Sequence, residues 1–167
     1  ALKGTCGIGH TRWATHGEPS MVNAHPHVSG NCMHSGSGPV ESEVVGVHNG
    51  IIENYTELRA KLMKNGYTFY SQTDTEVLIK LVDYYYKKYN LGPIDAIAKT
   101  MVRVRGSYAL EVMFRDYPGE IWVARKDSPM IIGIADGETY VASDVPAILK
   151  YTRNVYYIGN LEFAKLT

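Results

Sequence analysis

The chain has 167 residues, of which 45% are hydrophobic, and its 17 basic and 17 acidic side chains leave it with no formal net charge. Its length and composition predict one globular domain with a core of its own and argue against disorder. The balanced charge argues against nucleic acid or a membrane surface as a partner, and no apolar run has the ~18 residues of a membrane span.

The two ends of the chain predict a fragment of a longer polypeptide. The chain begins at Ala1 without Met or a signal peptide's apolar region, and it stops at Thr167 inside a segment typical of a strand. Two cysteines, Cys6 and Cys32, allow at most one disulfide bond. They therefore exclude a disulfide scaffold and favour reduced thiols in a cytoplasmic protein.

Residues 4–38 are rich in Gly, His, Ser and Pro and show little periodicity. This composition predicts a loop region, and long loops in compact domains are often functional. Within it, the stretch Ser29–Ser42 predicts a flexible excursion because it is dense in Ser and Gly.

Regular structure is expected from Val44 onward. The apolar run Val44–Val47 predicts a buried strand, and three helices should follow it. The signals that start these helices are Asn54 with Glu57, Thr73 with Glu76 (two pairs that resemble capping boxes) and Pro93. Gly66 and Gly106 are placed to end the first and the third helix.

Two further expectations concern the same region. Residues Tyr67–Tyr70 predict a second strand between the first two helices. In the third helix, four apolar side chains are expected to face inward: Ile94, Ile97, Met101 and Val102.

The last third of the chain changes to the period of strands. Apolar residues alternate over 108–114, and further strands are expected at 121–124, 130–134 and 140–142, with Asp136-Gly137 as a hairpin turn. A short helix at 145–151 and a last strand at 155–158 complete the prediction. Because the helices are grouped in the middle and the hairpins come later, the pattern favours an α+β fold.

All six histidines lie before residue 49, which makes metal binding one interpretation of this region. His25 and His27 fall on one side of an extended segment, and His16 or Asp74 would be a third ligand. The alternative is a set of loop histidines bonded to backbone groups, and no established zinc-binding pattern is present.

The tripeptide His48-Asn49-Gly50 follows the first buried strand. An Asn amide beside a Gly N–H can supply two donors to one oxygen, as an oxyanion requires, but Asn-Gly is also common in plain turns. Trp13 is either a core residue or part of a loop that closes over a ligand.

Arg12 and Asp74 together have the charges needed to recognise an α-amino acid, since a guanidinium binds carboxylate and a carboxylate binds ammonium. Each also has a simpler explanation. Arg12 would pair with a surface acid, and Asp74 would be favoured in the first turn of a helix by the helix dipole.

Several segments, in this order, strongly resemble the glutaminase domain of the glutamine–fructose-6-phosphate aminotransferases, a group of class II glutamine amidotransferases. The matching segments are His10–Ser20, Asn23–His27, His48–Asn54, Thr73–Glu76, Gly106–Ala109 and Ser128-Pro129. The resemblance runs from about Gly4 to the end of the chain. It implies an N-terminal-nucleophile hydrolase fold, an αββα sandwich of two sheets between two helical layers.

The resemblance also implies roles for individual residues. Arg12, helped by Thr15 and His16, would bind the α-carboxylate of glutamine, and Asp74 would hold its α-amino group near Gly50. Asn49 and Gly50 would form the oxyanion hole. Trp13 would lie in a mobile loop over the substrate, and His25 is placed among the substrate-binding residues.

One departure from the family concerns the nucleophile, which in the family is an N-terminal cysteine whose free amine serves as its base. The segment Cys6–Gly9 imitates the sequence around that cysteine, but Cys6 is internal and lies too close to His10. We therefore expect Cys6 to occupy a strand leading into the loop. Residues 1–167 would then be a partial amidotransferase domain, without its N-terminal nucleophile and without the C-terminal sugar-isomerase domains.

The implied function is the glutaminase half of a glucosamine-6-phosphate synthase. The parent would hydrolyse L-glutamine and deliver ammonia to fructose 6-phosphate through the isomerase domains, as a cytoplasmic homodimer, with no metal or organic cofactor for the glutaminase half. The isolated chain would be inactive. Two alternatives remain open: a class II amidotransferase with a different acceptor, and a non-catalytic glutamine-binding module.

Overall fold

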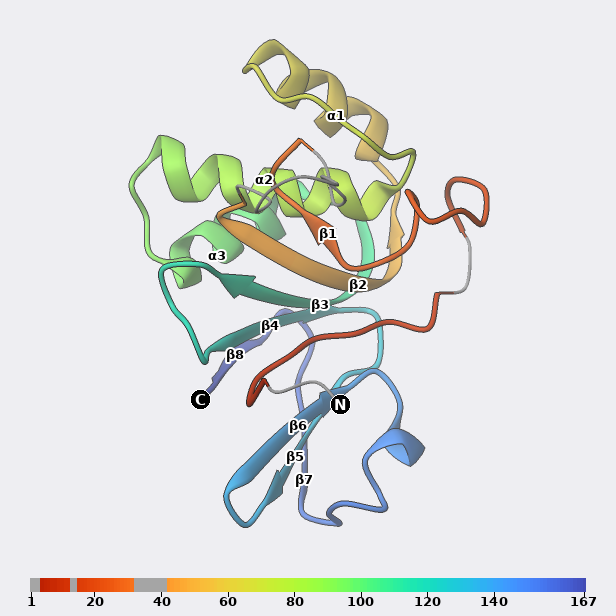
Figure 1. The fold of residues 1–167 in the computed structure, drawn as a ribbon, viewed down its shortest axis with the longest axis vertical. Coiled ribbons are helices and arrows are strands. Elements are labelled where there is room, and N and C mark those ends of the chain that lie inside the picture. The colour runs from red at the N-terminus through yellow and green to blue at the C-terminus, as the bar shows by residue number, and fades with distance from the viewer. Residues whose placement is uncertain (1–3, 13–14, 32–41) are drawn as a thin grey trace.

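The computed structural model describes residues 4–12, 15–31 and 42–167. Three helices lie on one side of a five-stranded sheet, and a three-stranded sheet lies on its other side (Figure 1). The predicted α+β class is confirmed. Among the described residues, no helix is long and apolar enough to cross a membrane.

All neighbouring strands are antiparallel. The larger sheet has the spatial order β1 (His27–Val28), β2 (Val44–Ile52), β3 (Gly106–Phe114), β4 (Ile121–Lys126) and β8 (Phe163–Leu166). The smaller sheet has the order β6 (Glu138–Ala142), β5 (Ile131–Ala135) and β7 (Val155–Tyr157). The helices are α1 (Tyr55–Lys64), α2 (Asp74–Lys88) and α3 (Pro93–Arg103), with a 3₁₀ turn, η1, at Val145–Ala147.

The apolar residues form one cluster on each side of the larger sheet. The first lies between that sheet and the helices, and α2 is buried from Asp74 through Tyr85 at its centre. The second joins the two sheets; its buried members are Ala109, Val123, Met130, Ile132, Ile158 and Leu166. The larger sheet therefore buries apolar side chains on both faces, against the helices on one and against the smaller sheet on the other, and such burial is the main force holding layers together.

Gly46 allows α2 to approach β2 closely. A Cβ at this position would lie 2.3 Å from Ile79 Cδ1 and 2.8 Å from the backbone oxygen of Glu111. Ile79 is itself fully buried, and the Glu111 oxygen belongs to the backbone of β3, so a side chain at this position would require the layers to shift. The absence of a side chain at Gly46 thus sets the distance between the helical layer and the sheet.

Several local predictions are confirmed. Pro93 begins α3, Thr73 is the N-cap of α2 with its side chain accepting a bond from Glu76 N, and Gly137 has φ +71° in the β5–β6 hairpin. The segment after residue 162 is indeed a strand, so the strand at Val155–Tyr157 is not the last. The helix expected at 145–151 is only the short turn η1.

The predicted strand at Tyr67–Tyr70 is wrong, because these residues form an irregular segment. Side chains of α2 satisfy its backbone instead of a neighbouring strand. Lys80 donates to Thr68 O at 2.5 Å, and Glu76 accepts from Tyr70 N at 3.0 Å and from Ser71 N at 2.7 Å. Two of the backbone groups that could have joined a sheet, Thr68 O and Tyr70 N, are therefore already paired.

Asn54 precedes α1 but does not cap it with its side chain, contrary to the expected capping box. Its amide donates to Arg103 O at 3.0 Å, and its carbonyl accepts from Arg105 N at 2.9 Å, so it ties the start of α1 to the end of α3. In α3 the expected inward face is also partly wrong. Ile94 is 44% exposed and Val102 is 82% exposed. The fully buried face consists of Pro93, Ala96, Ile97 and Thr100.

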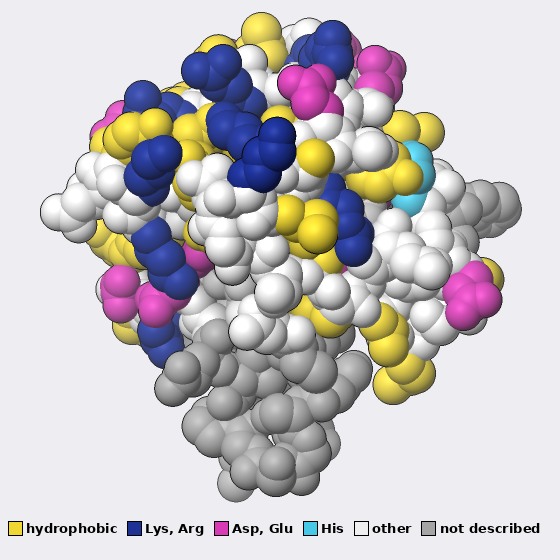
Figure 2. Space-filling model, turned by 90° about the horizontal axis from the view of Figure 1, so that it is seen from above, with side chains coloured by type: hydrophobic (Ala, Val, Ile, Leu, Met, Phe, Trp, Pro, Cys, Tyr) yellow, Lys and Arg dark blue, Asp and Glu magenta, His cyan; other side chains and the backbone are white. Residues whose placement is uncertain are grey.

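Lysine and tyrosine side chains pack together on the helical side. Figure 2, which views the molecule from above Figure 1, shows Lys and Arg gathered on this face. Lys88 Nζ lies 4.9 Å from the ring centroid of Tyr84, and Lys99 Nζ lies 5.3 Å from that of Tyr89. Such contacts let long charged side chains cover aromatic rings while their ammonium groups stay in water.

Candidate active site

A cleft of about 840 Å³ opens between the two sheets beside the start of α2. Its lining comes mainly from residues 7–12, the end of β2, the start of α2, β3, and residues 139–144 of the smaller sheet with the turn after it. Of the residues predicted for the site, those that line this cleft are Arg12, Thr15, His25, Asn49, Gly50 and Asp74. The fold therefore brings together residues that are far apart in the sequence.

Asn49 and Gly50 belong to β2, which continues to Ile52, so the plain-turn interpretation of this tripeptide is wrong. Gly50 has φ +137°, and a Cβ there would lie 2.2 Å from Ser107 O, so the position requires glycine. Asn49 is exposed to the cleft, and its Nδ2 donates to Ser143 Oγ at 3.1 Å. A side-chain amide and the backbone of a glycine thus lie next to each other at the cleft wall.

The Arg12 guanidinium is held by backbone carbonyls of its own loop. Nη2 donates to His16 O at 2.9 Å and to Gly17 O at 3.3 Å, and the backbone N donates to His10 Nδ1 at 2.8 Å. Its Nε is buried without a partner, and no carboxylate pairs with Arg12 within the described part of the chain. The guanidinium therefore retains donors for an anion, contrary to a simple surface ion pair.

Asp74 is the first residue of α2 and is buried. Its Oδ2 accepts from Ile52 N at 2.9 Å and lies 3.6 Å from His16 Nδ1. A buried carboxylate with so few donors retains lone pairs for a cationic ligand. His16 does not line the cleft; it contacts Asp74, which does. Trp13 lies outside the described residues.

The rings of His10, His25 and His27 contact one another in that order, and those of His10 and His25 line the cleft. The His10 and His25 centroids are 4.2 Å apart, and those of His25 and His27 are 5.1 Å apart. Burial lowers the pKa of His25 to about 2 and that of His27 to about 4, so both rings are uncharged at neutral pH. Because these two rings are uncharged, the positive charge on this side of the cleft is that of the Arg12 guanidinium.

Of the two histidines in the metal interpretation, His25 has ring contacts with His10 and His27 but a buried Nδ1 without a hydrogen-bond partner. His27 is bonded through both ring nitrogens, to Tyr70 and to Thr73. Over residues 4–12, 15–31 and 42–167, no group of three or more His, Cys, Asp or Glu side chains is arranged to hold a metal ion.

Sequence reasoning missed several polar residues of this cleft, among them His48, Ser143 and Glu111. His48 is buried beside Asn49 and bonds Thr75 Oγ1 through Nδ1 at 3.0 Å; burial lowers its pKa, and the Asp74 carboxylate partly opposes that shift. Ser143 holds the Asn49 amide. Glu111 lines the cleft from β3, and burial raises its pKa to about 7. Only His48 had a sequence signal, its place next to Asn49.

Cys6 does not line this cleft, although its neighbour Gly7 does. It lies in an irregular segment, so its predicted place on a strand is wrong. It lines a separate hollow of about 400 Å³ together with residues 42–45 and 113–115. The thiol is therefore not among the groups that line the Asn49 cleft.

Comparisons with known proteins identify the family of this chain. A family model described as a glutamine amidotransferase domain matches residues 27–150. The chain is 51% identical over 163 residues to glutamine–fructose-6-phosphate aminotransferase (isomerizing) from Caldanaerobacter subterraneus subsp. tengcongensis, covering 98% of this chain and 25% of that protein. It is 50% identical over 166 residues to the protein of the same name from Clostridium acetobutylicum, covering 99% and 25%. The chain thus spans about a quarter of the length of these relatives.

Solved structures show the same fold. Glutamine phosphoribosylpyrophosphate amidotransferase from B. subtilis, complexed with ADP and GMP, superposes with a TM-score of 0.70 at 25% identity, covering 95% of this chain and 32% of that chain. A structure described as the allosteric regulatory enzyme of purine biosynthesis has a TM-score of 0.70 at 23% identity, covering 87% and 30%. The N-terminal-nucleophile hydrolase-like fold is therefore confirmed. Of its two helical layers, the described residues include the one formed by α1, α2 and α3.

Proposed function

Because this chain belongs to the family of glutamine amidotransferase domains, we propose that its cleft binds L-glutamine for hydrolysis of the side-chain amide. The whole protein would use the ammonia to convert fructose 6-phosphate to glucosamine 6-phosphate. The observation that carries this proposal is the single cleft lined by Arg12, Asp74, Asn49 and Gly50. It combines a cationic group, an anionic group and oxyanion donors around one space.

Each pole of glutamine has a counterpart in this cleft. The α-carboxylate would meet Arg12, which has an unpartnered Nε and lies near the exposed Thr15. The α-ammonium would meet the buried carboxylate of Asp74, which the Ile52 N–H holds in place. Opposite charges on two walls orient an α-amino acid and leave its side chain directed along the cleft.

The chemistry would take place at Asn49 and Gly50. A thiolate attacks the side-chain amide carbon, and the carbonyl oxygen becomes an oxyanion that the Asn49 amide and the Gly50 N–H stabilise. Collapse of this intermediate releases ammonia and leaves a thioester, which water hydrolyses to glutamate. By resemblance to the family, the nucleophile would be an N-terminal cysteine of the whole protein. None of these steps needs a metal ion or an organic cofactor.

Expression of the complete gene provides the test. The purified protein should release glutamate from L-glutamine and form glucosamine 6-phosphate when fructose 6-phosphate is present. Glutamate release without amino sugar would favour another acceptor, and glutamine binding without hydrolysis would favour a binding module. By the same resemblance we propose a cytoplasmic homodimer, and light scattering of the purified protein would test the oligomeric state.

Replacing a charged residue at either pole should impair glutamine use. We expect Arg12→Lys and Asp74→Asn each to lower kcat/KM by about ten- to a hundredfold, since a charge-assisted bond contributes about 1.5–3 kcal/mol. The measurement is steady-state glutamate release. Activity with free ammonia as donor, where the protein has it, is the control that should survive, and equal loss with both donors would contradict the assignment.

Replacement of Cys6 should have almost no effect. Because Cys6 lines a different hollow from Asn49, we expect Cys6→Ser to change glutamate release by about twofold at most, as is usual for residues outside an active site. The same assay measures it, with wild type prepared in parallel. Loss of all activity would make Cys6 the nucleophile.

A further inference from the structure

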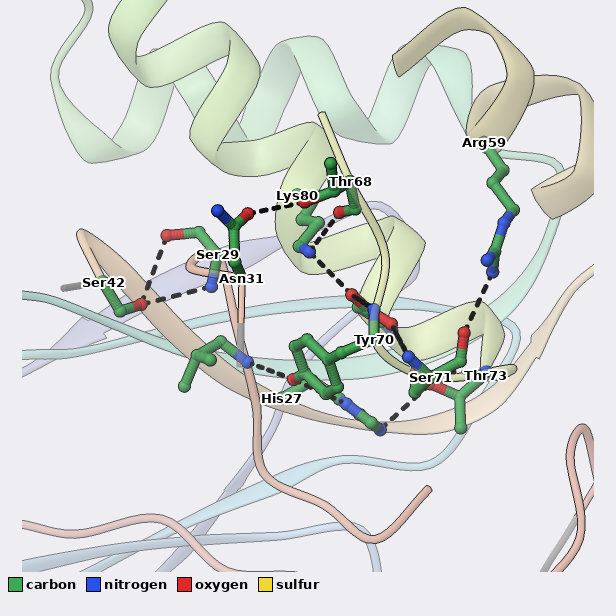
Figure 3. Close-up of polar contacts among 12 residues, drawn as sticks. His27, Ser29, Asn31, Ser42, Arg59, Thr68, Tyr70, Ser71, Thr73 and Lys80 are labelled. Carbon is green, nitrogen blue, oxygen red and sulfur yellow. Dashed lines mark hydrogen bonds and ion pairs between the residues drawn. The ribbon is translucent and has the colours of Figure 1, made fainter. Parts of the chain in front are cut away.

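His27 connects two walls of the cleft without lining it. Its ring is fully buried; Nδ1 lies 3.0 Å from Tyr70 Oη and Nε2 lies 3.0 Å from Thr73 Oγ1. Figure 3 shows the ring lying between these two hydroxyl groups. His27 is in β1, two residues after His25, which lines the cleft. Thr73 immediately precedes Asp74, the proposed ammonium ligand.

The Thr73 end of this contact belongs to a closed set of buried bonds. Thr73 Oγ1 accepts from Glu76 N at 3.2 Å and lies 3.1 Å from Ser71 Oγ, which in turn donates to Glu76 Oε2 at 2.5 Å. Glu76 is paired with Lys80 at 2.7 Å, both side chains being fully buried. The first turn of α2 is therefore fixed by polar contacts that water does not reach, and His27 joins that turn to β1.

A neutral imidazole suits this place. Burial lowers the pKa of His27 to about 4, and a neutral ring presents one donor and one acceptor nitrogen. Both neighbours are hydroxyl groups, which can act as donor or acceptor. The ring can thus satisfy both bonds at once without placing a charge near Arg12.

We propose that His27 is a positioning residue of the glutamine site, which acts through Thr73 to hold the Asp74 carboxylate in register with the wall that carries His25. This inference rests on the proposed function. It assigns to His27 an effect on substrate binding rather than on the chemical step, because the ring touches neither the cleft nor the oxyanion donors.

The test uses two amides that each keep one of the two bonds. In the protein expressed from its complete gene, His27→Gln places its amide near the Nε2 position and keeps the bond to Thr73. His27→Asn places it near Nδ1 and keeps only the bond to Tyr70. We expect the Asn variant to raise KM for L-glutamine by about three- to tenfold, as for one lost buried hydrogen bond, and the Gln variant by about twofold at most. The kcat of both variants should equal that of wild type.

Ser29→Ala is the matched control for stability. Ser29 lies in the same segment, and its hydroxyl accepts from Glu43 N at 3.2 Å and Val44 N at 3.1 Å, on the side away from Thr73. This variant should lower the melting temperature and leave KM unchanged. Thr73→Val removes the hydroxyl at the other end of the contact and should raise KM as His27→Asn does. This variant replaces His27→Asn in the test if the Asn variant does not fold.

The results distinguish a failure of the positioning role of His27 from a failure of the proposed glutamine hydrolysis. Equal KM values for the Asn and Gln variants, or an unchanged KM in Thr73→Val, would overturn the role of His27. Asp74→Asn serves as the reference for the site itself. If Asp74→Asn raises KM and the His27 and Thr73 variants do not, only this inference fails. If wild type does not hydrolyse glutamine, or Asp74→Asn leaves KM unchanged, the proposed function fails with it.

Discussion

Replacing Asn49 with Ala should lower kcat for glutamine hydrolysis by about 10²–10³ while changing KM much less, because an oxyanion donor acts mainly in the transition state. The structure places the Asn49 amide at the cleft wall, beside Gly50, with Nδ2 donating to Ser143 Oγ. A preorganised amide costs no reorientation when charge develops on the substrate oxygen. The measurement is steady-state glutamate release over a range of L-glutamine concentrations.

Asn65→Ala is a suitable control for this prediction. Asn65 follows α1, and its amide bonds Lys61 O at 2.8 Å on an exposed surface away from the cleft. Its replacement should leave both kinetic constants near those of wild type. If Asn49→Ala instead raised KM sharply with kcat unchanged, Asn49 would be a substrate-positioning residue and not an oxyanion donor.

Replacing Lys80 with Met should destabilise the fold by about 3–5 kcal/mol, since breaking a buried ion pair leaves one charge without its partner. Lys80 Nζ lies 2.7 Å from Glu76 Oε1, donates to Thr68 O, and lies 4.9 Å from the ring centroid of Phe69. Met fills a similar volume but satisfies neither oxygen. Denaturant unfolding, followed by circular dichroism, measures the change in free energy.

An exposed pair provides the comparison. Arg105 pairs with Glu57 at 3.1 Å, and their side chains are 70% and 71% exposed. Arg105→Met should therefore cost about 1 kcal/mol or less. Similar losses for Lys80→Met and Arg105→Met would show that the buried pair adds nothing beyond a surface contact.

The elements that sequence reasoning predicted well are those whose signals are local. Pro93 has a fixed φ that suits the first turn of a helix, and Thr73 needs only a backbone N–H three residues ahead of it. Asp136-Gly137 forms a turn because Gly137 accepts a positive φ. In each case the deciding interaction lies within a few residues, so the pattern alone carries the information.

The elements that it predicted wrongly depend on distant partners. Tyr67–Tyr70 has the composition of a strand, but its backbone is hydrogen-bonded to the side chains of Glu76 and Lys80 and not to a neighbouring strand. Asn54 has the right neighbour for a capping box, yet its side chain is drawn to Arg103 and Arg105 at the end of α3. In both segments, contacts with other parts of the fold determine the structure, and the local propensity does not.

The site was predictable only in its parts. The charges of Arg12 and Asp74 suggest an α-amino acid, but nothing in their spacing shows that they line one cleft. Their roles in glutamine binding remain predictions. Ser143 was beyond sequence reasoning, because its bond to Asn49 spans 94 positions and joins two sheets.

The close packing at Gly46 has a consequence for substrate length. In the proposed site, two layers would recognise the ligand together: Asp74 on α2 would hold its ammonium, and Asn49 on β2 would face its amide. The close approach of α2 to β2 at Gly46 would therefore set the distance between these two groups. Asparagine, one methylene shorter than glutamine, would reach Asp74 but leave its carbonyl carbon short of the oxyanion donors. Selectivity for chain length would then reside in a buried glycine that no ligand touches.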